Sequence, residues 1–435
     1  MSMVFDEHPE RLSVTNELHA RPFQPMRAPG RALQLAFKQP SAAERDPERD
    51  REHLTALLDR FGVAHPAPGA NHHTVDIGRF VLKWERHTEF VSYTLYEQGE
   101  TDRMFQAGLA DHLPQDWVAS APGKVIAAIQ CEFIMSDGRE DALEMMRGPL
   151  APEFSAESLA VAWVVNKCVL ALGDFRIHEG GYSRFALIIC GNVGPRRIGR
   201  VCQRLMEIEV YRTLSMLALP VARKTAGRLT EIERDLTAMV SDVASQNGGG
   251  SDEEILASLT QLSADIEALK ANTAFRFGAG GAYEALVNER IDMLHEERVE
   301  GRQQLREFML RRYQPAMRTV HAAERRLQDI SLRASRMAQL LRTRVNVALE
   351  AQNQDLLESM NARADMQLRL QRTVEGLSVV AISYYAVSLA GYLLYPLSDV
   401  IGLSEGEITA VATIPIVLGV WWFVRRIRAK LEKDG

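Results

Sequence analysis

The chain has 435 residues, of which 46% are hydrophobic, and a formal net charge of −6 at pH 7. This length and apolar fraction are sufficient for two or three domains with buried cores. The slightly acidic balance argues against a protein that coats nucleic acid through its overall charge.

The first 195 residues predict a domain that mixes strands and helices. Helices are expected near residues 41–61 and 139–146. The strand-like stretches are rich in Val, Ile, Phe and Tyr and are separated by turn residues. They cover residues 31–37, 74–84, 89–97, 124–135, 159–165, 167–173, 174–179 and 184–190. This interleaving predicts a cytoplasmic α/β domain over residues 1–195 and an α+β protein overall, rather than a barrel.

The cysteines and the N-terminal stretch indicate a reducing compartment. The four cysteines lie in apolar or helical contexts without CxxC spacing: Cys131, Cys168, Cys190 and Cys202. This pattern is typical of buried free thiols rather than of a disulfide framework or a zinc site. The opening residues, MSMVFDEHPERLSVTNELHARP, lack the apolar core of a secretory signal peptide. We therefore expect most of the chain to be cytoplasmic.

Residues 196–372 predict a helical layer followed by a long stalk. Apolar residues recur at helical spacing, with a kink expected at Pro220 and a break or flexible loop at Gly278–Ala282. The last helix is expected to start near Tyr283 and to continue to Pro396. Residues at alternating steps of three and four form an imperfect heptad seam, which predicts a coiled coil. They are Leu327, Ile330, Ala334, Met337, Leu341, Val345, Ala348, Gln352 and Leu356.

Two arginine-rich stretches lie in this helical region. On one helix, Arg200, Arg204, Glu207 and Tyr211 share a face, for which solvated or interdomain ion pairing is the expected role. Further on, Arg302–Arg344 contains eleven arginines, no lysine and three acidic residues. Arginine pairs with carboxylates through two parallel hydrogen bonds, so acidic surfaces of neighbouring helices or subunits are the expected partners. Anionic lipid and nucleic acid are the alternatives, and no nucleic-acid partner is expected.

Two uncharged stretches predict transmembrane helices at residues 373–398 and 408–424. Gly376–Ser398 has no charge over 23 residues, a helix of roughly 34 Å. Ile408–Val424 has 17 uncharged residues and ends near two tryptophans, as expected at a membrane interface. The alternative is a buried hairpin in a soluble domain.

Basic residues predict the orientation of these spans. Arg363, Arg369 and Arg372 precede the first span, and the tail at residues 425–435 contains five further basic residues. The loop at residues 399–407 contains no Lys or Arg. The positive-inside rule therefore predicts a bacterial inner-membrane protein with both termini cytoplasmic and the acidic loop outside.

The order of these segments resembles the CorA-like magnesium-transporter superfamily. Ala390–Asp399, AGYLLYPLSD, occupies the place of that family's Ala-Gly-Ile-Tyr-Gly-Met-Asn stretch, but its Gly-Met-Asn signature is absent. The resemblance covers about the last 180 residues in order and kind. It implies a ring of five subunits around a pore formed by the first spans. Without the signature, it does not imply magnesium selectivity.

Several distinctive motifs resemble an uncharacterised bacterial family, a domain of unknown function (DUF3422). They are NELHARPF (16–23), VVNKCVLALGDFRIHEGGYSRF (164–185), GRVCQRLMEIEVYRTLSMLALP (199–220) and TVEGLSVVAISYY (373–385). This resemblance covers nearly the whole chain. It implies family membership and no particular activity.

The first span contains a polar stripe. Its members, spaced 7, 3, 4 and 3 residues apart, lie within about 100° on a helix: Ser378, Tyr385, Ser388, Tyr392 and Tyr395. Such groups in a bilayer face protein or water. The stripe therefore predicts either a pore lining or a helix–helix interface.

Three acidic residues follow the first span: Asp399, Glu405 and Glu407. Repeated in an oligomer, they would raise the local concentration of cations at the outer end of a pore. The alternative is that these residues have no role in attracting cations. The positive-inside rule by itself leaves acidic residues in the outer loop.

A polar cluster in the first domain suggests a metal or phosphate pocket. Its candidate residues come from ELHARPF and GDFRIHEGGYSRF: His19, Arg21, Asp174, Arg176, His178 and Glu179. Alternation in the second motif would place Asp174, Arg176 and His178 on one strand face. One His and one carboxylate do not complete a zinc ligand set. A hairpin held by an ion pair, or packed on the N-terminal arm, is the alternative.

Together these features predict an oligomeric membrane protein in which the first span lines a path for cations and the cytoplasmic domain gates it. The alternative is a membrane-anchored scaffold or regulatory protein that conducts nothing. Expected partners are membrane lipid, further copies of the chain and cations; no cofactor or resident metal is expected. An enzyme is not expected, because the chain has no Walker A motif, no GxGxxG after a strand and no nucleophile elbow. A metal- or phosphate-dependent activity of the α/β domain is the alternative.

Overall fold

The computed structural model describes residues 8–17, 22–40, 45–99, 104–105, 107–244, 252–394 and 404–434. Tyr395, Pro396 and Asp399 from the predicted first span and loop lie outside these ranges. The chain divides into two compact units, Met1–Ala338 and Gln339–Gly435. We call the first unit the head and describe each unit by itself.

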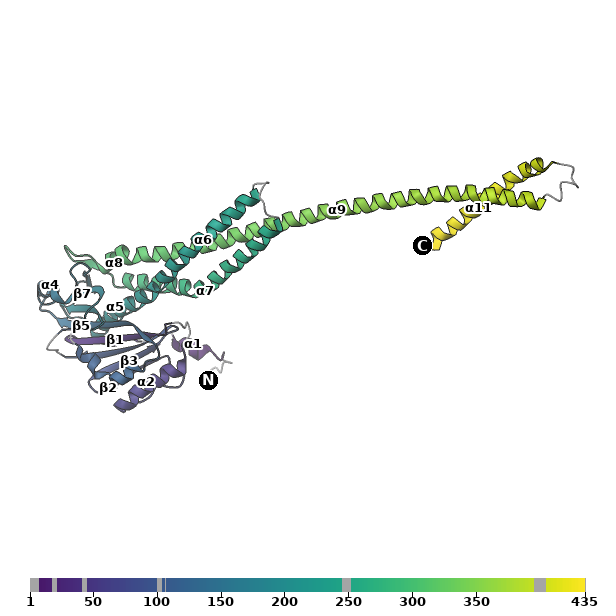
Figure 1. Ribbon diagram of the computed structural model, residues 1–435. Coiled ribbons are helices and arrows are strands. Elements are labelled where there is room, and N and C mark those ends of the chain that lie inside the picture. Colours follow the sequence, from purple (N-terminus) through teal and green to yellow (C-terminus); the bar gives the residue numbers. More distant parts are fainter. Residues whose placement is uncertain are drawn as a thin grey trace, which may run out of the picture. The chain divides into compact units, whose positions relative to one another are not determined.

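The head is built on a mixed nine-stranded sheet with strand order β2-β3-β4-β1-β5-β8-β7-β6-β9 (Figure 1). Neighbouring strands are antiparallel except β5 and β8, which are parallel. The strands are β1 (Gly30–Lys38), β2 (His72–Ile77), β3 (Phe80–Arg86), β4 (Phe90–Gln98), β5 (Lys124–Met135), β6 (Ala160–Val164), β7 (Val169–Ile177), β8 (Ser183–Ile189) and β9 (Glu297–Arg298). The expected α+β class is thus confirmed.

Two of the predicted strand boundaries were wrong. Residues 74–84, expected as one strand, form the β2–β3 hairpin, whose turn contains Gly78 at a φ of 75°. A left-handed φ of this kind is accessible to glycine at little cost. Residues 167–179, expected as two strands, instead contain the single strand β7 with an irregular register between Gly173 and Ile177.

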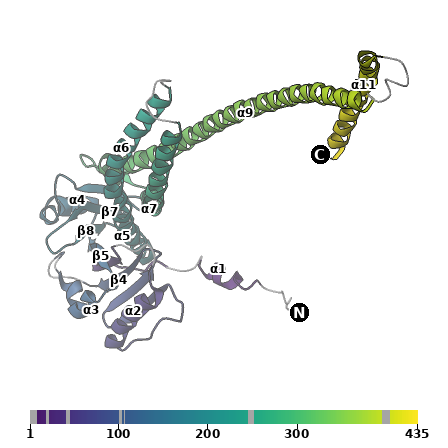
Figure 2. The same cartoon turned by 45° about the vertical axis from the view of Figure 1, so that its right-hand side comes forward.

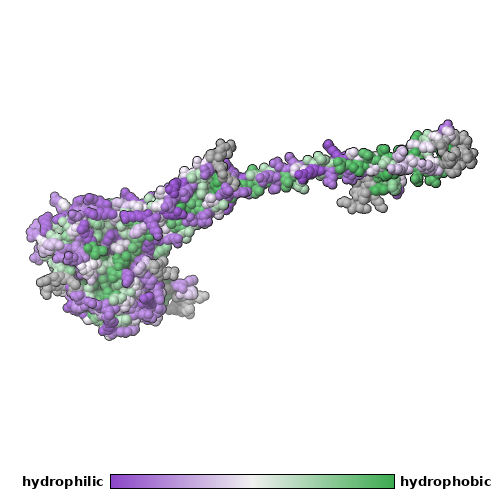
Figure 3. All heavy atoms as spheres, in the orientation of Figure 1, coloured by the Kyte–Doolittle hydropathy of each residue, from purple (hydrophilic) through white to green (hydrophobic). Residues whose placement is uncertain are grey.

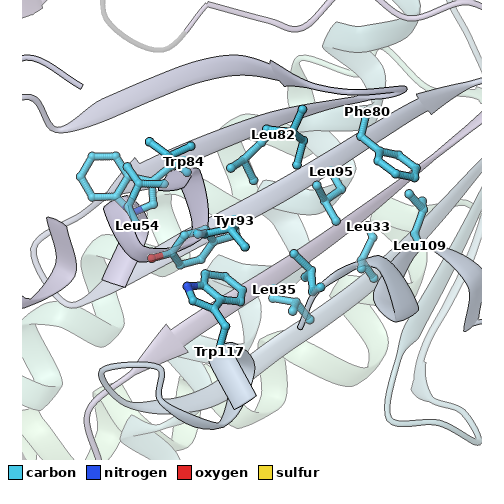
Figure 4. Close-up of a cluster of buried hydrophobic side chains, with 14 of the residues drawn as sticks. Leu33, Leu35, Leu54, Phe80, Leu82, Trp84, Tyr93, Leu95, Leu109 and Trp117 are labelled. Carbon is cyan, nitrogen blue, oxygen red and sulfur yellow. The ribbon is translucent and has the colours of Figure 1, made fainter. Parts of the chain in front are cut away.

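Short helices cover one face of the first half of the sheet. Alternate residues of β1, β3 and β4 pack against α2 (Pro47–Phe61), α3 (Gln115–Ala119) and η1 (Ala107–His112). Figure 4 shows this cluster, with Trp84, Tyr93 and Trp117 in contact with leucines of the strands and of α2. Further short helices are α1 (Arg11–Glu17), α4 (Arg139–Arg147) and η2 (Ala151–Glu153); α4 packs on β6, β7 and β8.

The opposite face of the sheet meets the helix α5 (Pro195–Met216), which packs on β5. Buried Cys131 of β5 contacts Cys202 of α5 through its thiol. All four cysteines are free thiols, and Cys168 and Cys190 are half-buried. The face toward α5 contains the other alternate residues of β1, β3 and β4, and three of them, Gln34, Glu85 and Ser92, line the cavity described below.

One expected helix break is present and one is not. The chain is interrupted at Leu217, between α5 and α6 (Ala218–Ala244), within the turn that precedes Pro220. Pro220 lies in the first turn of α6. Backbone N–H groups in a first turn have no acceptor within the helix, so proline, which has no N–H, is tolerated there. The Gly278–Ala282 stretch lies inside the continuous helix α7 (Asp252–Asp292). A Cβ on Gly280 would lie 2.9 Å from the Cβ of Ala218, so this glycine permits close helix packing.

The last long helix of the head also starts later than expected. After α7 come β9, α8 (Leu305–Phe308) and the π-helical turn η3 (Met309–Tyr313), and α9 (Gln314–Leu394) then continues for 81 residues. Figures 1 and 2 show α6, α7 and the first part of α9 side by side. Arg326 of α9 forms an ion pair with Glu233 of α6, and His321 contacts Glu284 of α7 at 2.6 Å. The first part of the predicted seam, from Leu327 to Met337, is therefore buried within the chain.

The second unit consists of the rest of α9 and α11 (Glu405–Asp434). By length and composition, α9 and Gly406–Ile427 of α11 contain stretches apolar enough to cross a membrane. These apolar stretches are only 6% and 0% buried. Figure 3 shows hydrophobic residues gathered on the surface of the last part of α9 and of α11.

Candidate functional site

The predicted polar cluster in the head is only partly assembled. His19 and Arg21 lie outside the residues that the structure describes. Asp174 is fully buried and contacts His178 Nε2 at 2.9 Å, and it also accepts hydrogen bonds from the backbone N–H groups of Ser155 and Arg176. A carboxylate with these three partners connects the end of β7 to the backbone at Ser155.

The expected alternation along this strand was wrong. Phe175 adopts a φ of 55°, and the β7–β8 register shifts at this point. As a result, Arg176 and Glu179 are exposed, and Arg176 lies 3.6 Å from Glu157 instead of beside His178. Just before the shift the two strands approach closely, because a Cβ on Gly173 would lie 2.5 Å from the ring of Phe185. Among the candidate residues that the structure describes, only the side chains of Asp174 and His178 are brought together.

A polar cavity of about 450 Å³ lies elsewhere in the head, between the sheet and α5. Its walls come from β1, β3, β4, α5, α7 and the chain just after α7. Sheet alternation explains the first wall: the odd-numbered residues Leu33, Leu35 and Phe37 of β1 face the apolar cluster, so Gln34 faces the cavity. The wall formed by α5 follows from helical spacing. Its residues are three or four positions apart and therefore lie on one side of the helix: Arg200, Arg204, Glu207 and Tyr211.

A chain of hydrogen bonds crosses the base of this cavity. Lys83 Nζ lies 3.0 Å from Glu85 Oε1 and donates to Gln203 Oε1, also at 3.0 Å. Gln203 Nε2 donates to Glu207 Oε1 at 2.7 Å, and Glu207 in turn accepts from Arg290 Nε of α7. These contacts connect β3, α5 and α7. Because Lys83 is 2% exposed, its charge requires such partners.

Two further arginines of the cavity have different partners. Arg204 Nη1 donates to the backbone oxygen of Met293 at 2.8 Å, and the guanidinium of Arg200 lies 5.1 Å from the ring centre of Phe23. Among the described residues, neither forms an ion pair with a carboxylate. Burial, followed by the charges of Arg200 and Arg290, lowers the pKa of Arg204, whereas Glu207 raises it. The cavity therefore contains an excess of positive charge.

Gln34 is the other incompletely satisfied group. Its side chain is 8% exposed in total and donates through Nε2 to Thr94 Oγ1 at 3.2 Å. Its Oε1 atom is buried and has no hydrogen-bond partner among the described residues. A buried polar atom without a partner is uncommon in folded proteins.

The N-terminal arm closes one end of the cavity. Met26 donates its backbone N–H to Pro195 at 3.0 Å. A Cβ on Gly199 would lie 1.8 Å from the backbone oxygen of Gln24, so only glycine allows the arm to cross α5 here. The arm thereby places Phe23 under Arg200. This explains the glycine at the start of the GRVCQRL motif.

Sequence reasoning found part of this site without recognising it. The shared face of Arg200, Arg204, Glu207 and Tyr211 was predicted, but solvated or interdomain ion pairing was the expected role. Gln34, Lys83, Glu85 and Arg290 were not singled out at all. The sequence did contain one indication of the site. Lys83 and Glu85 are polar residues at alternate positions of β3, so they share one face of the sheet.

In the second unit, Ser378, Tyr385, Ser388 and Tyr392 all lie on α9, whereas Tyr395 lies outside the described residues. The hydroxyls of Ser378 and Ser388 donate to the carbonyls of Val374 and Tyr384, at 2.7 and 3.0 Å. A cavity of about 570 Å³ lies between the end of α9 and the start of α11. Polar and small residues line it, among them Ser388, Gly391, Tyr392, Thr409 and Thr413.

The acidic residues near this cavity have partly structural surroundings. Asp399 lies outside the described residues, and nothing is described of the side chain of Glu405, the first residue of α11. Glu407 Oε2 accepts hydrogen bonds from Ser404, from N at 3.0 Å and from Oγ at 2.8 Å. Its carboxylate therefore stabilises the first turn of α11.

The chain belongs to the family described as "Protein of unknown function (DUF3422)", whose family model matches residues 6–431. The resemblance noted from the sequence motifs is thus confirmed. No curated protein matches the chain.

Proposed function

We propose that this DUF3422 protein is a homo-oligomer that spans the membrane with the ends of α9 and α11 and passes cations between copies of α9. The observation that carries the proposal is a single helix face of α9. It is mainly apolar in the stalk, where Gln352, Arg363 and Gln367 interrupt it, and it contains tyrosine and serine in the span; most of its residues are exposed. No ion is assigned.

This face can be followed residue by residue. At about 100° per residue, its members lie within roughly 60° of Leu356 around the helix axis. They are Leu349, Leu356, Met360, Leu370, Val374 and Leu377, and then Tyr385, Ser388 and Tyr392. Leu349, at 47%, is the least exposed of the leucines, and Tyr392 is 82% exposed. The apolar seam of the stalk and the polar stripe of the span are therefore one surface.

An exposed apolar seam on a long helix favours self-association. An isolated helix of this length has few contacts to keep it ordered in water, and burying the seam against further copies removes apolar surface from the solvent. Because the helix continues without a break, the polar stripe then faces the same axis. A ring of α9 helices would surround a path lined by Ser388, Tyr385 and Tyr392.

The ends of the apolar helices suit a bilayer interface. Arg425 and Arg426 each lie 5.0 Å from a ring centre, of Trp421 and Trp422 respectively. Aromatic rings with adjacent basic residues are typical of the cytoplasmic interface. This supports a topology with both termini inside and with the head in the cytoplasm. Movement of α9 as one rigid helix would then open or close the path near Ser388.

The second candidate function is a membrane-anchored scaffold that conducts nothing. It is favoured by the bonding of Ser378 and Ser388, whose hydroxyls are satisfied within their own helix. Such serines need neither water nor an ion. In this case the polar stripe is only an interface between helices.

Ion flux into liposomes separates the two functions. Purified full-length protein is reconstituted, and uptake of monovalent and divalent cations is compared for wild type, Ser388→Leu and Tyr392→Leu. Val380→Leu is the matched control, because Val380 is 71% exposed and lies about 120° from Tyr392 around the helix. We expect the two stripe variants to lose flux and the control to keep it. Absence of flux for every cation would favour the scaffold.

The mass of the detergent complex is a second, independent measurement. A pore lined by α9 requires at least three copies around the axis, and the resemblance to the CorA-like superfamily implies five. A monomer or dimer would contradict the path for cations while leaving the membrane anchor intact.

A further inference from the structure

The geometry of the head points to a ligand site: we propose that the cavity between the sheet and α5 binds the phosphate group of a small organic phosphate. Arg200, Arg204 and Arg290 would hold the phosphate group. The proposal does not depend on whether the protein conducts ions.

The charges of the cavity support an anion as the ligand. Glu85 lies 3.0 Å from Lys83, and Glu207 pairs with Arg290, which also lies 3.2 Å from Glu289. Both cavity carboxylates are therefore neutralised, and Arg290 contributes hydrogen-bond donors but no uncompensated charge. Arg200 and Arg204 have no carboxylate partner among the described residues. Guanidinium groups remain charged at neutral pH, so this wall of the cavity carries uncompensated positive charge.

The arrangement of the three arginines supports phosphate over carboxylate. Arg200 and Arg204 are four residues apart on α5, and Arg290 comes from α7 on the same cavity. A carboxylate has two oxygens, and one guanidinium fork satisfies both. A phosphate monoester offers three terminal oxygens that share up to two negative charges, and it can accept from several guanidinium groups at once. Binding would also relieve the mutual repulsion of Arg204, Arg200 and Arg290, whose charges lie close enough to lower the pKa of Arg204.

The size of the cavity and Gln34 support an organic group beyond the phosphate. At about 450 Å³, the cavity falls in the size range of small-molecule sites and exceeds what one inorganic phosphate fills. Gln34 Oε1 is an acceptor without a partner in its wall. This oxygen has almost no accessible surface, so a ligand hydroxyl or amine would satisfy it only after the Gln34 side chain rotates toward the cavity. The rings of Tyr211 and His87 provide the less polar part of the wall.

Titration calorimetry on the full-length protein in detergent tests the proposal. The probes are inorganic phosphate, pyrophosphate and adenosine monophosphate, with citrate as the carboxylate and adenosine as the uncharged comparison. Ionic strength is held constant with chloride. We expect saturable binding of the phosphate probes, tightest for adenosine monophosphate, and no comparable binding of citrate or adenosine.

Variants then locate the site. Arg204→Gln should weaken binding of the phosphate probes by about tenfold or more, because a hydrogen bond to a charged group is lost. Arg204→Lys should bind with intermediate affinity, because lysine keeps the positive charge but cannot donate two parallel hydrogen bonds. Arg223→Gln, an exposed arginine of α6 that does not line the cavity, should bind as wild type. Far-ultraviolet circular dichroism confirms that each variant is folded.

Three results would overturn the proposal. One is the absence of saturable binding for all three phosphate probes. Another is tighter binding of citrate than of any of them, which would make the ligand a carboxylate. The third is equal affinity of folded Arg204→Gln and wild type, which would place the phosphate elsewhere on the protein.

Discussion

The head and the second unit bury their apolar residues in opposite ways. In the head, leucines such as Leu54, Leu57 and Leu58 are 0% exposed, and aromatic rings fill the space between sheet and helices (Figure 4). In the second unit, Leu356, Leu370 and Tyr392 are 59%, 67% and 82% exposed. The head therefore contains its own core. The second unit leaves most of its apolar side chains exposed in the single chain.

This difference explains how one helix can serve both units. Up to Met337, the predicted seam of α9 is buried by helices of the same chain. Leu341 is also fully buried, and beyond it the apolar residues of α9 are largely exposed. The same heptad pattern thus produces an intramolecular bundle in one place and an unpartnered stalk in the other, depending on whether other helices of the chain are present to pack against it.

The largest effect on the head is expected from opening its core. Leu57→Ala should lower the free energy of unfolding by about 2–5 kcal/mol, because a fully buried side chain is removed and a cavity remains. Urea unfolding of a purified fragment comprising residues 1–338 measures this change. A fragment that unfolds without a cooperative transition would contradict the view that the head folds independently.

The next effect is a dependence of head stability on pH. Burial raises the pKa of Glu132 to about 7 from 4.5, with smaller contributions from Glu97 and Glu153, whereas Arg31 and the N–H of Phe105 lower it. The folded head then binds a proton that the unfolded chain has released, so stability falls as the pH rises from about 4.5 to about 7. Over this range the loss from Glu132 is roughly 3 kcal/mol.

Glu132→Gln isolates this contribution. Its amide oxygen can still accept the hydrogen bond that Phe105 N–H donates to Glu132 at 3.0 Å. The variant should match wild type near pH 4.5 and exceed its stability by roughly 3 kcal/mol at pH 8, measured by urea unfolding at both pH values. Equal stability at pH 8 would show that the buried carboxylate has compensating partners.

A smaller effect is expected where helices of the head approach closely. Gly280→Ala adds a Cβ that would lie 2.9 Å from the Cβ of Ala218, and should cost about 1–3 kcal/mol through overpacking. Gly278→Ala is the matched control on the same helix, because no atom lies within 4 Å of its added Cβ. The control should be neutral or slightly stabilising, since alanine favours a helix over glycine.

The smallest effect on head stability is expected from the stalk. Leu356→Ala should change the unfolding of the head by less than about 0.5 kcal/mol, because the side chain is largely exposed in the single chain. It should nevertheless weaken the detergent oligomer, as measured by analytical ultracentrifugation. If Leu356→Ala instead destabilised the head and left the oligomer unchanged, the prediction that Leu356 serves association between copies would be wrong.

Features that depend on neighbouring residues were predicted well. The strands at residues 31–37 and 124–135 and the helix at 139–146 correspond to β1, β5 and α4. Helix breaks were predicted less well, because glycine in Gly278–Ala282 indicates a loop locally, whereas packing against Ala218 keeps α7 intact. The hairpin of Asp174 and His178 was partly predicted, but its face pattern changed at Phe175.

The sequence by itself determined the mixed head, the long helix and the two apolar stretches, because periodicity, turn residues and the length of uncharged runs are local properties. Tertiary structure alone decided the cavity of the head. Gln34, Lys83, Arg204 and Arg290 come from four different elements, and their meeting depends on strand register and on how α5 and α7 pack against the sheet. Sequence spacing records neither of these, since both follow from contacts between residues far apart in the chain.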